Sequence, residues 1–246
     1  MLIIGHRGAS GYEPENTLPA FRLAGSLGAD GVELDVRWTG DRKAVVLHGD
    51  EVEKVSDGRG RASQMTLGEL KRLNFAFKDP SFQGREPLPE LWEALDACRD
   101  MELIDIEIKT DVPEGDDLPA YVAELVRRMG ISRRVVVSCF SLPAVLLAKK
   151  ENPELRIGFL WKHPGSFRKT AETCFFCGVD LLCPSAQLVT ERMVAFSTGL
   201  GLAVYPWTVD CPKRALRLAE MGCQGIITNY PDIIRDSVPA VLDRNR

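Results

Sequence analysis

Short apolar runs rich in β-branched residues alternate with helix-length amphipathic segments along almost the whole chain, and this alternation limits the possible fold more than any other feature. Such repetition is typical of a parallel sheet whose strands are joined by crossover helices. The predicted strands are residues 2–5, 31–36, 103–109, 134–140, 156–161, 179–184, 202–209 and 225–228. Eight strands in a chain of 246 residues predict an α/β fold, the (β/α)8 TIM barrel, which commonly needs about 250 residues.

A ninth apolar run, residues 43–48, does not fit this count. It follows the second strand after a few residues only, whereas a parallel crossover needs about a dozen or more. The run is therefore predicted to be the antiparallel arm of a hairpin. A turn centred on residues 40–43 would pair Thr39 with Ala44 and place Asp35 opposite His48.

The stretch from about residue 49 to about residue 86 interrupts the alternation of strands and helices. Thr66 and Glu69 form a capping-box pattern that predicts a short helix reaching about Phe75. The stretch is too small for an independent domain. We therefore expect residues 1–246 to form a single barrel domain, with an insertion over about 49–86 at its catalytic end.

Carboxylates stand on two of the predicted strands, and active sites in this fold lie at the C-terminal strand ends. Alternation sends Glu33 and Asp35 to one side of the second strand. Glu107 has the same orientation on the third strand, so the three side chains should point into the barrel. Converging carboxylates raise one another's pKa unless they are compensated. A hard divalent cation, Mg²⁺ or Ca²⁺, would supply that compensation.

Cations and histidines occupy the neighbouring strand ends. Arg7 and Lys109 are placed to bind phosphate oxygens. As an alternative, they and Arg37 could pair with the carboxylates in a buried salt-bridge cluster. His6 ends the first strand and His48 ends the hairpin arm. Imidazoles titrate near neutral pH, so one could accept a proton from the nucleophile while the other donates one to the leaving alkoxide.

Charge and composition narrow the possible partners. The net charge is −4 and no basic block is present, whereas a nucleic acid partner needs a concentrated Lys and Arg face. No apolar run approaches about 18 residues and no secretory signal precedes the first strand. Seven scattered cysteines favour reduced thiols. We expect a cytoplasmic protein without nucleic acid or stable membrane insertion, either a monomer or a homodimer.

Motifs spread over essentially the whole chain resemble the glycerophosphodiester phosphodiesterase family. These motifs are His6-Arg7-Gly8-Ala9, Pro14-Glu15-Asn16-Thr17, Gly31-Val32-Glu33-Leu34-Asp35-Val36, Glu107-Ile108-Lys109, Trp207-Thr208-Val209 and Gly225-Ile226-Ile227-Thr228. The resemblance implies a barrel enzyme, a phosphoric diester hydrolase, that converts glycerophosphodiesters to glycerol 3-phosphate and an alcohol.

The resemblance also implies a role for each matching residue. Glu33, Asp35 and Glu107 would hold Mg²⁺ or Ca²⁺, and His6 and His48 would be the acid/base pair. The residues implied for the substrate are Arg7 and Lys109 on the phosphate, Glu15 in the first loop, and Phe140 and Trp207 on the wall facing the glycerol or the leaving group.

Three positions depart from the family's usual pattern. Gly49 stands between His48 and Asp50, where the family commonly has Asp directly after the histidine. The usual Asn after Trp-Thr-Val is Asp210 here, and the usual Asp after the final Ile-Thr is Asn229. The last two lie near the predicted mouth, where they could alter which alcohol is accepted.

The expected mechanism has one histidine as base and the other as acid, acting on a water or a neighbouring glycerol hydroxyl. We favour His6 as base and His48 as acid, and the sequence leaves the reverse order open. Two other functions stay open. Release of headgroups from lysolipids would need an apolar rim, and the insertion offers only Phe75, Phe77 and Phe82 for it. A non-catalytic phosphate-binding barrel would require the loss of a catalytic group.

Overall fold

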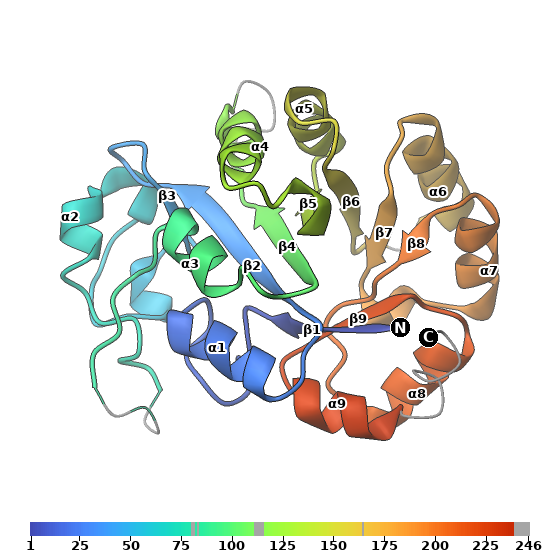
Figure 1. Ribbon diagram of the computed structural model, residues 1–246, viewed down its shortest axis with the longest axis horizontal. Helices are drawn as coiled ribbons and strands as arrows, with labels where there is room; N and C mark the ends of the chain where they lie inside the picture. Colours follow the sequence, from blue (N-terminus) through green and yellow to red (C-terminus); the bar gives the residue numbers. More distant parts are fainter. Residues whose placement is uncertain (80–81, 83, 111–115, 164, 239–246) are drawn as a thin grey trace.

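Nine strands form one sheet in the computed structural model, which describes residues 1–79, 82, 84–110, 116–163 and 165–238 (Figure 1). Eight of them are joined by parallel pairing in the order β8-β7-β6-β5-β4-β2-β1-β9. Their bounds are β1 (Leu2–His6), β2 (Gly31–Trp38), β4 (Leu103–Ile108), β5 (Val135–Cys139), β6 (Arg156–Trp161), β7 (Leu181–Pro184), β8 (Ala203–Val204) and β9 (Gly225–Thr228). The ninth, β3 (Ala44–Val46), pairs with β2 in the antiparallel direction.

The two ends of this sheet meet between β8 and β9. Ile227 N donates to Pro206 O at 3.0 Å, and Val209 N donates to Ile227 O at 2.9 Å. These bonds continue the parallel pairing just beyond the end of β8 and bring the sheet round on itself. The predicted TIM barrel is confirmed.

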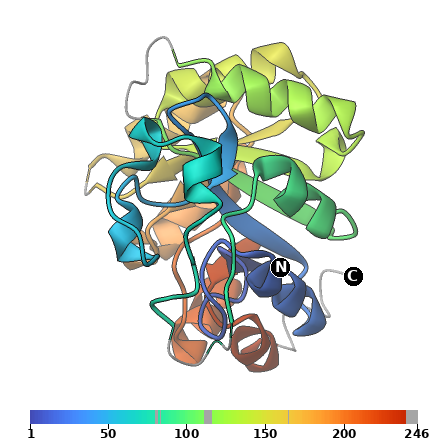
Figure 2. The same ribbon diagram turned by 90° about the vertical axis from the view of Figure 1, so that its left-hand side faces the viewer.

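Helices surround the barrel in both views (Figures 1 and 2). They are α1 (Leu18–Ser26), α3 (Leu91–Ala97), α4 (Leu118–Arg128), α5 (Leu142–Glu151), α6 (Phe167–Phe176), α7 (Glu191–Gly199), α8 (Pro212–Glu220) and α9 (Pro231–Ser237), with 3₁₀ turns η3 (Ser132–Arg134) and η4 (Ala186–Leu188). Side chains of Thr17, Ser141 and Thr190 cap α1, α5 and α7. Within the described ranges, no helix combines the length and apolarity that a membrane span requires. The chain's seven cysteines are free thiols.

Alternation along the strands separates two apolar layers. Val32, Leu34 and Ile106 are fully buried against the surrounding helices. Leu103 and Ile227 belong to a second cluster inside the barrel. Each fully buried aliphatic side chain of this kind stabilises the fold by about 1.5–3 kcal/mol. The apolar interior fills one end of the barrel and leaves the carboxyl ends of the strands to polar side chains.

The β2–β3 hairpin differs from the predicted register by one residue. Trp38 pairs with Ala44, so the predicted pairing of Thr39 with Ala44 is wrong. Leu47, and not His48, lies opposite Asp35, since Leu47 N donates to Asp35 O at 3.0 Å.

The cause of the shift is the length of the turn. Thr39 N donates to Lys43 O at 2.9 Å, which leaves a loop of residues 40–42. Arg42 has a φ of 60°, the left-handed conformation with which three-residue hairpin loops commonly end. His48 therefore follows the end of the ladder, where it lines the same pocket as His6.

Residues 49–79 lie beside the hairpin, on the side that Figure 2 presents to the viewer. They contain η1 (Val52–Lys54), η2 (Ala62–Gln64) and α2 (Leu67–Leu70). The capping box of Thr66 and Glu69 is present, but α2 ends at Leu70 and not near Phe75. Beyond the helix, Asn74 Oδ1 accepts from Ala76 N and Glu86 N at 3.0 Å each. Residues 80, 81 and 83 of the predicted insertion lie outside the described residues.

Candidate active site

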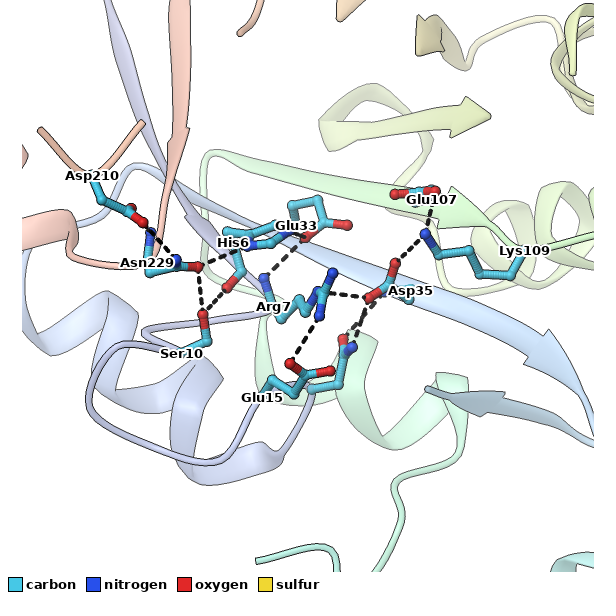
Figure 3. Close-up of polar contacts among 11 residues, drawn as sticks. His6, Arg7, Ser10, Glu15, Glu33, Asp35, Glu107, Lys109, Asp210 and Asn229 are labelled. Atoms are coloured by element: carbon cyan, nitrogen blue, oxygen red, sulfur yellow. Dashed lines mark hydrogen bonds and ion pairs between the residues drawn. The ribbon is translucent and has the colours of Figure 1, made fainter. Parts of the chain in front are cut away.

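Three carboxylates meet at the carboxyl ends of β2 and β4. Glu33 and Asp35 come from β2, and the strand register places Asp35 beside Glu107 of β4. One oxygen from each carboxylate lies within 4.8 Å of the others. Asp35 is fully buried and Glu33 is 4% exposed. The predicted convergence of the three side chains is therefore present (Figure 3).

Asp35 is compensated by cations on both sides. Lys109 Nζ lies 2.9 Å from Asp35 Oδ1, and Arg7 Nε lies 3.2 Å from Oδ2. Asn16 Nδ2 also donates to Oδ2 at 2.7 Å. Burial alone would raise the pKa of Asp35, but the charges of Lys109 and Arg7 outweigh it and lower that pKa to about 2.

Glu33 is compensated less, with only the charge of Arg7 opposing its burial among the causes of its pKa shift. Its Oε2 accepts from Arg7 N at 2.9 Å, while its buried Oε1 has no hydrogen-bond partner among the described residues. Burial first, and then the charges of Asp35 and Glu107, raise the pKa of Glu33 well above its usual value. A salt-bridge cluster therefore accounts for Asp35 but leaves Glu33 unsatisfied.

The donor set fits a hard divalent cation. Glu107 pairs with Lys109, and burial raises its pKa despite that contact. Carboxylate oxygens are the ligands that Mg²⁺ and Ca²⁺ prefer. A cation beside Glu33, Asp35 and Glu107 would give the orphaned Glu33 Oε1 a partner. Arg37, considered from the sequence as a partner for the cluster, instead pairs with Asp50 at 3.2 Å.

The first loop places Arg7 and Glu15 against this cluster. Arg7 has a φ of 55° directly after β1, and Gly8 follows at 85°. A Cβ on Gly8 would lie 2.6 Å from the Ala20 backbone, so only glycine lets the loop pack on α1. Arg7 Nη1 donates to Glu15 Oε2 at 2.8 Å. Glu15 itself does not line the pocket and supports the site through Arg7.

The two histidines line the same pocket, His6 from the end of β1 and His48 from the segment after β3. His6 Nε2 lies 3.9 Å from Glu33 Oε2, and His6 Nδ1 lies 2.7 Å from Asn229 Oδ1. Burial first, and then Arg7, lower the pKa of His6 to about 4. His48 is exposed at the mouth. One imidazole is thus partly buried beside the carboxylates, and the other faces solvent.

The pocket has a volume of about 730 Å³ and two unlike sides. Its charged side consists of the carboxylates, histidines and basic side chains described above. The opposite side carries aromatic and aliphatic residues, which are Phe140, Leu142, Pro143, Phe159, Leu160 and Trp207. The rings of Phe140 and Trp207 meet edge to face with centroids 5.7 Å apart, and Lys162 Nζ lies 4.7 Å from the Phe140 centroid.

Sequence reasoning missed two parts of the site. Asp105 lines the pocket and is 1% exposed, and burial raises its pKa to about 7. It stands two positions before Glu107, so strand alternation could have identified it. The second part is Asn229, which contacts His6 from the end of β9. It had been considered only as a departure from the usual pattern, although it follows a predicted strand.

Comparison with known proteins identifies the family. Residues 6–233 match the Glycerophosphoryl diester phosphodiesterase family. The chain belongs to this family. It is 32% identical over 238 residues to a glycerophosphodiester phosphodiesterase of Caldanaerobacter subterraneus subsp. tengcongensis, covering 95% of this chain and 96% of the relative. A Bacillus altitudinis glycerophosphodiester phosphodiesterase is 30% identical over 236 residues, with 94% and 95% covered.

Solved structures agree with the assignment. A phosphodiesterase of Oleispira antarctica, in complex with the product sn-glycerol-3-phosphate, has a TM-score of 0.85 at 27% identity and covers 96% of each chain. A glycerophosphodiester phosphodiesterase from Agrobacterium tumefaciens has a TM-score of 0.81 at 26% identity, with 96% of this chain and 99% of that chain covered. The predicted family and the predicted enzyme class, a phosphoric diester hydrolase, are confirmed.

Proposed function

We propose that this family member hydrolyses glycerophosphodiesters to glycerol 3-phosphate and an alcohol, in a reaction that requires a divalent cation. One observation carries the proposal: three converging carboxylates and two histidines share a pocket with Arg7 and Lys109. The Oleispira antarctica relative, which was solved with sn-glycerol-3-phosphate as its product, supports the substrate class. We further propose that residues 1–246 act as one barrel domain with an insertion at 49–86.

Glu33, Asp35 and Glu107 would hold Mg²⁺ or Ca²⁺. When bound, the cation would neutralise the diester phosphate and stabilise the charge that develops on it. Lys109 and Arg7 would bind phosphate oxygens beside it, the first as a point charge and the second as a planar fork. Both side chains are held in place through Asp35, so they need little reorganisation when the substrate enters.

The two histidines would move the protons. His6 would accept the proton of the nucleophile, either a water or a neighbouring glycerol hydroxyl. His48 would donate a proton to the oxygen of the leaving alcohol as the P–O bond breaks. The lowered pKa of the partly buried His6 suits a base that is neutral at rest. The exposed position of His48 lets it exchange its proton with solvent.

The insertion gives little support to lysolipids as substrates. Phe75 is 5% exposed and belongs to the small core that the insertion shares with the hairpin. Phe77 is 58% exposed, but neither it nor Phe82 lines the pocket. An apolar rim that could hold an acyl chain would need such side chains at the mouth. A soluble diester is therefore the better candidate, and parallel assays with glycerophosphocholine and lysophosphatidylcholine would separate the two.

The decisive assay measures glycerol 3-phosphate release from several glycerophosphodiesters, with EDTA treatment and metal add-back. His6→Ala and His48→Ala should each lower turnover by roughly 10²–10⁴-fold, the usual contribution of an acid or a base. His163→Ala is the matched control, because this third histidine is exposed and does not line the pocket. Turnover that survives the loss of both histidines would contradict the proposal. Metal-dependent stabilisation without hydrolysis of any diester would favour a binding barrel.

A further inference from the structure

A chain of hydrogen bonds runs from His6 through Asn229 to Asp210, away from the carboxylate cluster (Figure 3). His6 Nδ1 lies 2.7 Å from Asn229 Oδ1, and Ser10 Oγ lies 2.8 Å from the same oxygen. Asn229 Nδ2 lies 2.7 Å from Asp210 Oδ2. The side-chain amide of Asn229 thus lies between His6 Nδ1 and the carboxylate of Asp210.

Asp210 determines which way the amide of Asn229 points. A carboxylate can only accept hydrogen bonds. Asp210 Oδ1 accepts from Asn229 N at 2.8 Å and from Thr228 Oγ1 at 3.1 Å. Its Oδ2 must therefore face the amide nitrogen of Asn229. The amide oxygen of Asn229 is consequently the atom that faces His6, and no choice of flip is left open.

An amide oxygen is an acceptor only, so His6 Nδ1 must carry a hydrogen. We propose that Asn229 and Asp210 are positioning residues that hold the neutral imidazole of His6 as its Nδ1–H tautomer. The lone pair is then on Nε2, the nitrogen that lies 3.9 Å from Glu33 Oε2. The role of His6 as the proton acceptor rests on the proposed function. The tautomer rests on the hydrogen bonds alone.

Replacing the carboxylate by an amide should invert the tautomer. In Asp210→Asn the remaining oxygen at position 210 would still accept hydrogen bonds from the backbone N–H of Asn229 and from the Thr228 hydroxyl. The new NH₂ group would then face the NH₂ group of Asn229, and two donors cannot bond. Rotation of the Asn229 amide removes that conflict but turns its NH₂ group toward His6. Nδ1 becomes the acceptor and the proton moves to Nε2.

The swapped pair should restore the original tautomer. In the double variant Asp210→Asn with Asn229→Asp, the amide at 210 donates to the carboxylate at 229. That carboxylate accepts from His6 Nδ1–H, as the amide oxygen of Asn229 does in the parent. If Asp210 and Asn229 had a merely structural role, the single substitution would not invert the tautomer of His6 and the swapped pair would not restore it.

The test is ¹⁵N NMR of protein labelled at its three histidines, in which protonated and unprotonated imidazole nitrogens have distinct shifts. His6→Ala assigns the signals. We expect Nδ1–H in the parent, Nε2–H in Asp210→Asn and Nδ1–H in the swapped variant. An Nε2–H tautomer in the parent would overturn the inference, and so would an unchanged tautomer in Asp210→Asn. The parent spectrum alone tests the tautomer, so the test survives a variant that fails to fold.

Kinetics test whether the positioning of His6 by Asn229 and Asp210 affects turnover. Asp210→Asn should lower kcat by about 10²-fold or more with KM nearly unchanged, and the swapped variant should recover most of that loss. Tyr12→Phe is the matched control, because the Tyr12 hydroxyl bonds Asp232 in the same loop region but outside this chain of bonds. A tautomer inverted without loss of turnover would overturn the positioning role. If the parent protein shows the expected tautomer but hydrolyses no diester, the proposed function is contradicted and the tautomer assignment is not.

Discussion

The two sides of the pocket lie at the same end of one barrel but come from different strands, and they carry opposite chemistry. The ends of β1, β2 and β4 supply the carboxylates, His6, Arg7 and Lys109. The ends of β5 and β6 and the segment after β8 supply Phe140, Leu160 and Trp207. A barrel repeats one backbone geometry around its axis, so the side chains at the inward positions alone make this difference. In the proposed function, one side would bind the phosphate and the other the parts of the substrate that do not react.

Loss of a carboxylate from the charged side should have the largest effect. Glu33→Gln should lower turnover by about 10³-fold, because the bound cation contributes several kcal/mol to the transition state. The rise in melting temperature on adding Mg²⁺ or Ca²⁺ should shrink as well. The metal-free variant should not lose stability, since Glu33 is a buried carboxylate with a raised pKa.

Glu124→Gln is the control for this substitution, since Glu124 lies on α4 and forms ion pairs with the nearby Arg127 and Arg128. It should leave both turnover and the metal response unchanged. A Glu33→Gln enzyme that keeps the parent's metal response would remove Glu33 from the metal site.

Loss of Lys109, which pairs with both Asp35 and Glu107, should lower stability and activity together. Lys109→Met leaves two buried carboxylates, Asp35 and Glu107, without their common partner. The free energy of unfolding of the metal-free protein should fall by about 3–5 kcal/mol, measured by urea titration. Activity should fall by about 10²-fold, because the proposed donor to the phosphate is lost. Added metal should recover part of the stability.

The comparison is Lys54→Met, which removes an exposed ion pair with Glu51. Such surface pairs contribute about 0–1 kcal/mol. Equal losses of stability in the two variants would show that the charged side is no more dependent on its ion pairs than the surface is.

Truncation on the aromatic side should have a smaller effect of a different kind. Phe140→Ala removes the edge-to-face contact with Trp207, which is worth about 0.5–1.5 kcal/mol. We expect kcat/KM to fall by up to about tenfold, mostly through KM and to a different extent for different alcohols. Phe176→Ala, on an exposed ring of α6, should change nothing. A fall confined to kcat would place Phe140 with the reacting groups.

The smallest effect should come from the rim of the aromatic side. Lys162 lies over the Phe140 ring, and within the described residues no ion pair neutralises it. A charge near the surface interacts with a second one at 4 Å by about 1 kcal/mol in water. Lys162→Ala should therefore improve kcat/KM for glycerophosphocholine a few-fold, an effect that salt weakens, and leave glycerophosphoglycerol unaffected. An equal change for both substrates would contradict this account of the rim.

The strand pattern was sufficient to place the charged side. Period-two alternation put Glu33, Asp35 and Glu107 on inward faces, and their positions agree with that prediction. The hairpin register was not predictable in the same way. It depends on whether the turn closes over three or four residues, and the left-handed conformation of Arg42 decides that. Local sequence permitted both turns.

The sequence by itself determined the barrel and the family, because apolar periodicity and strand-end motifs are local properties that survive any packing of the helices. Only the tertiary structure decided how the polar groups are paired. His6 meets Asn229 across 223 positions of the chain, and Glu15 contacts the site through Arg7. Contacts of this kind depend on closure of the barrel, which brings β1 beside β9, and no local pattern encodes them.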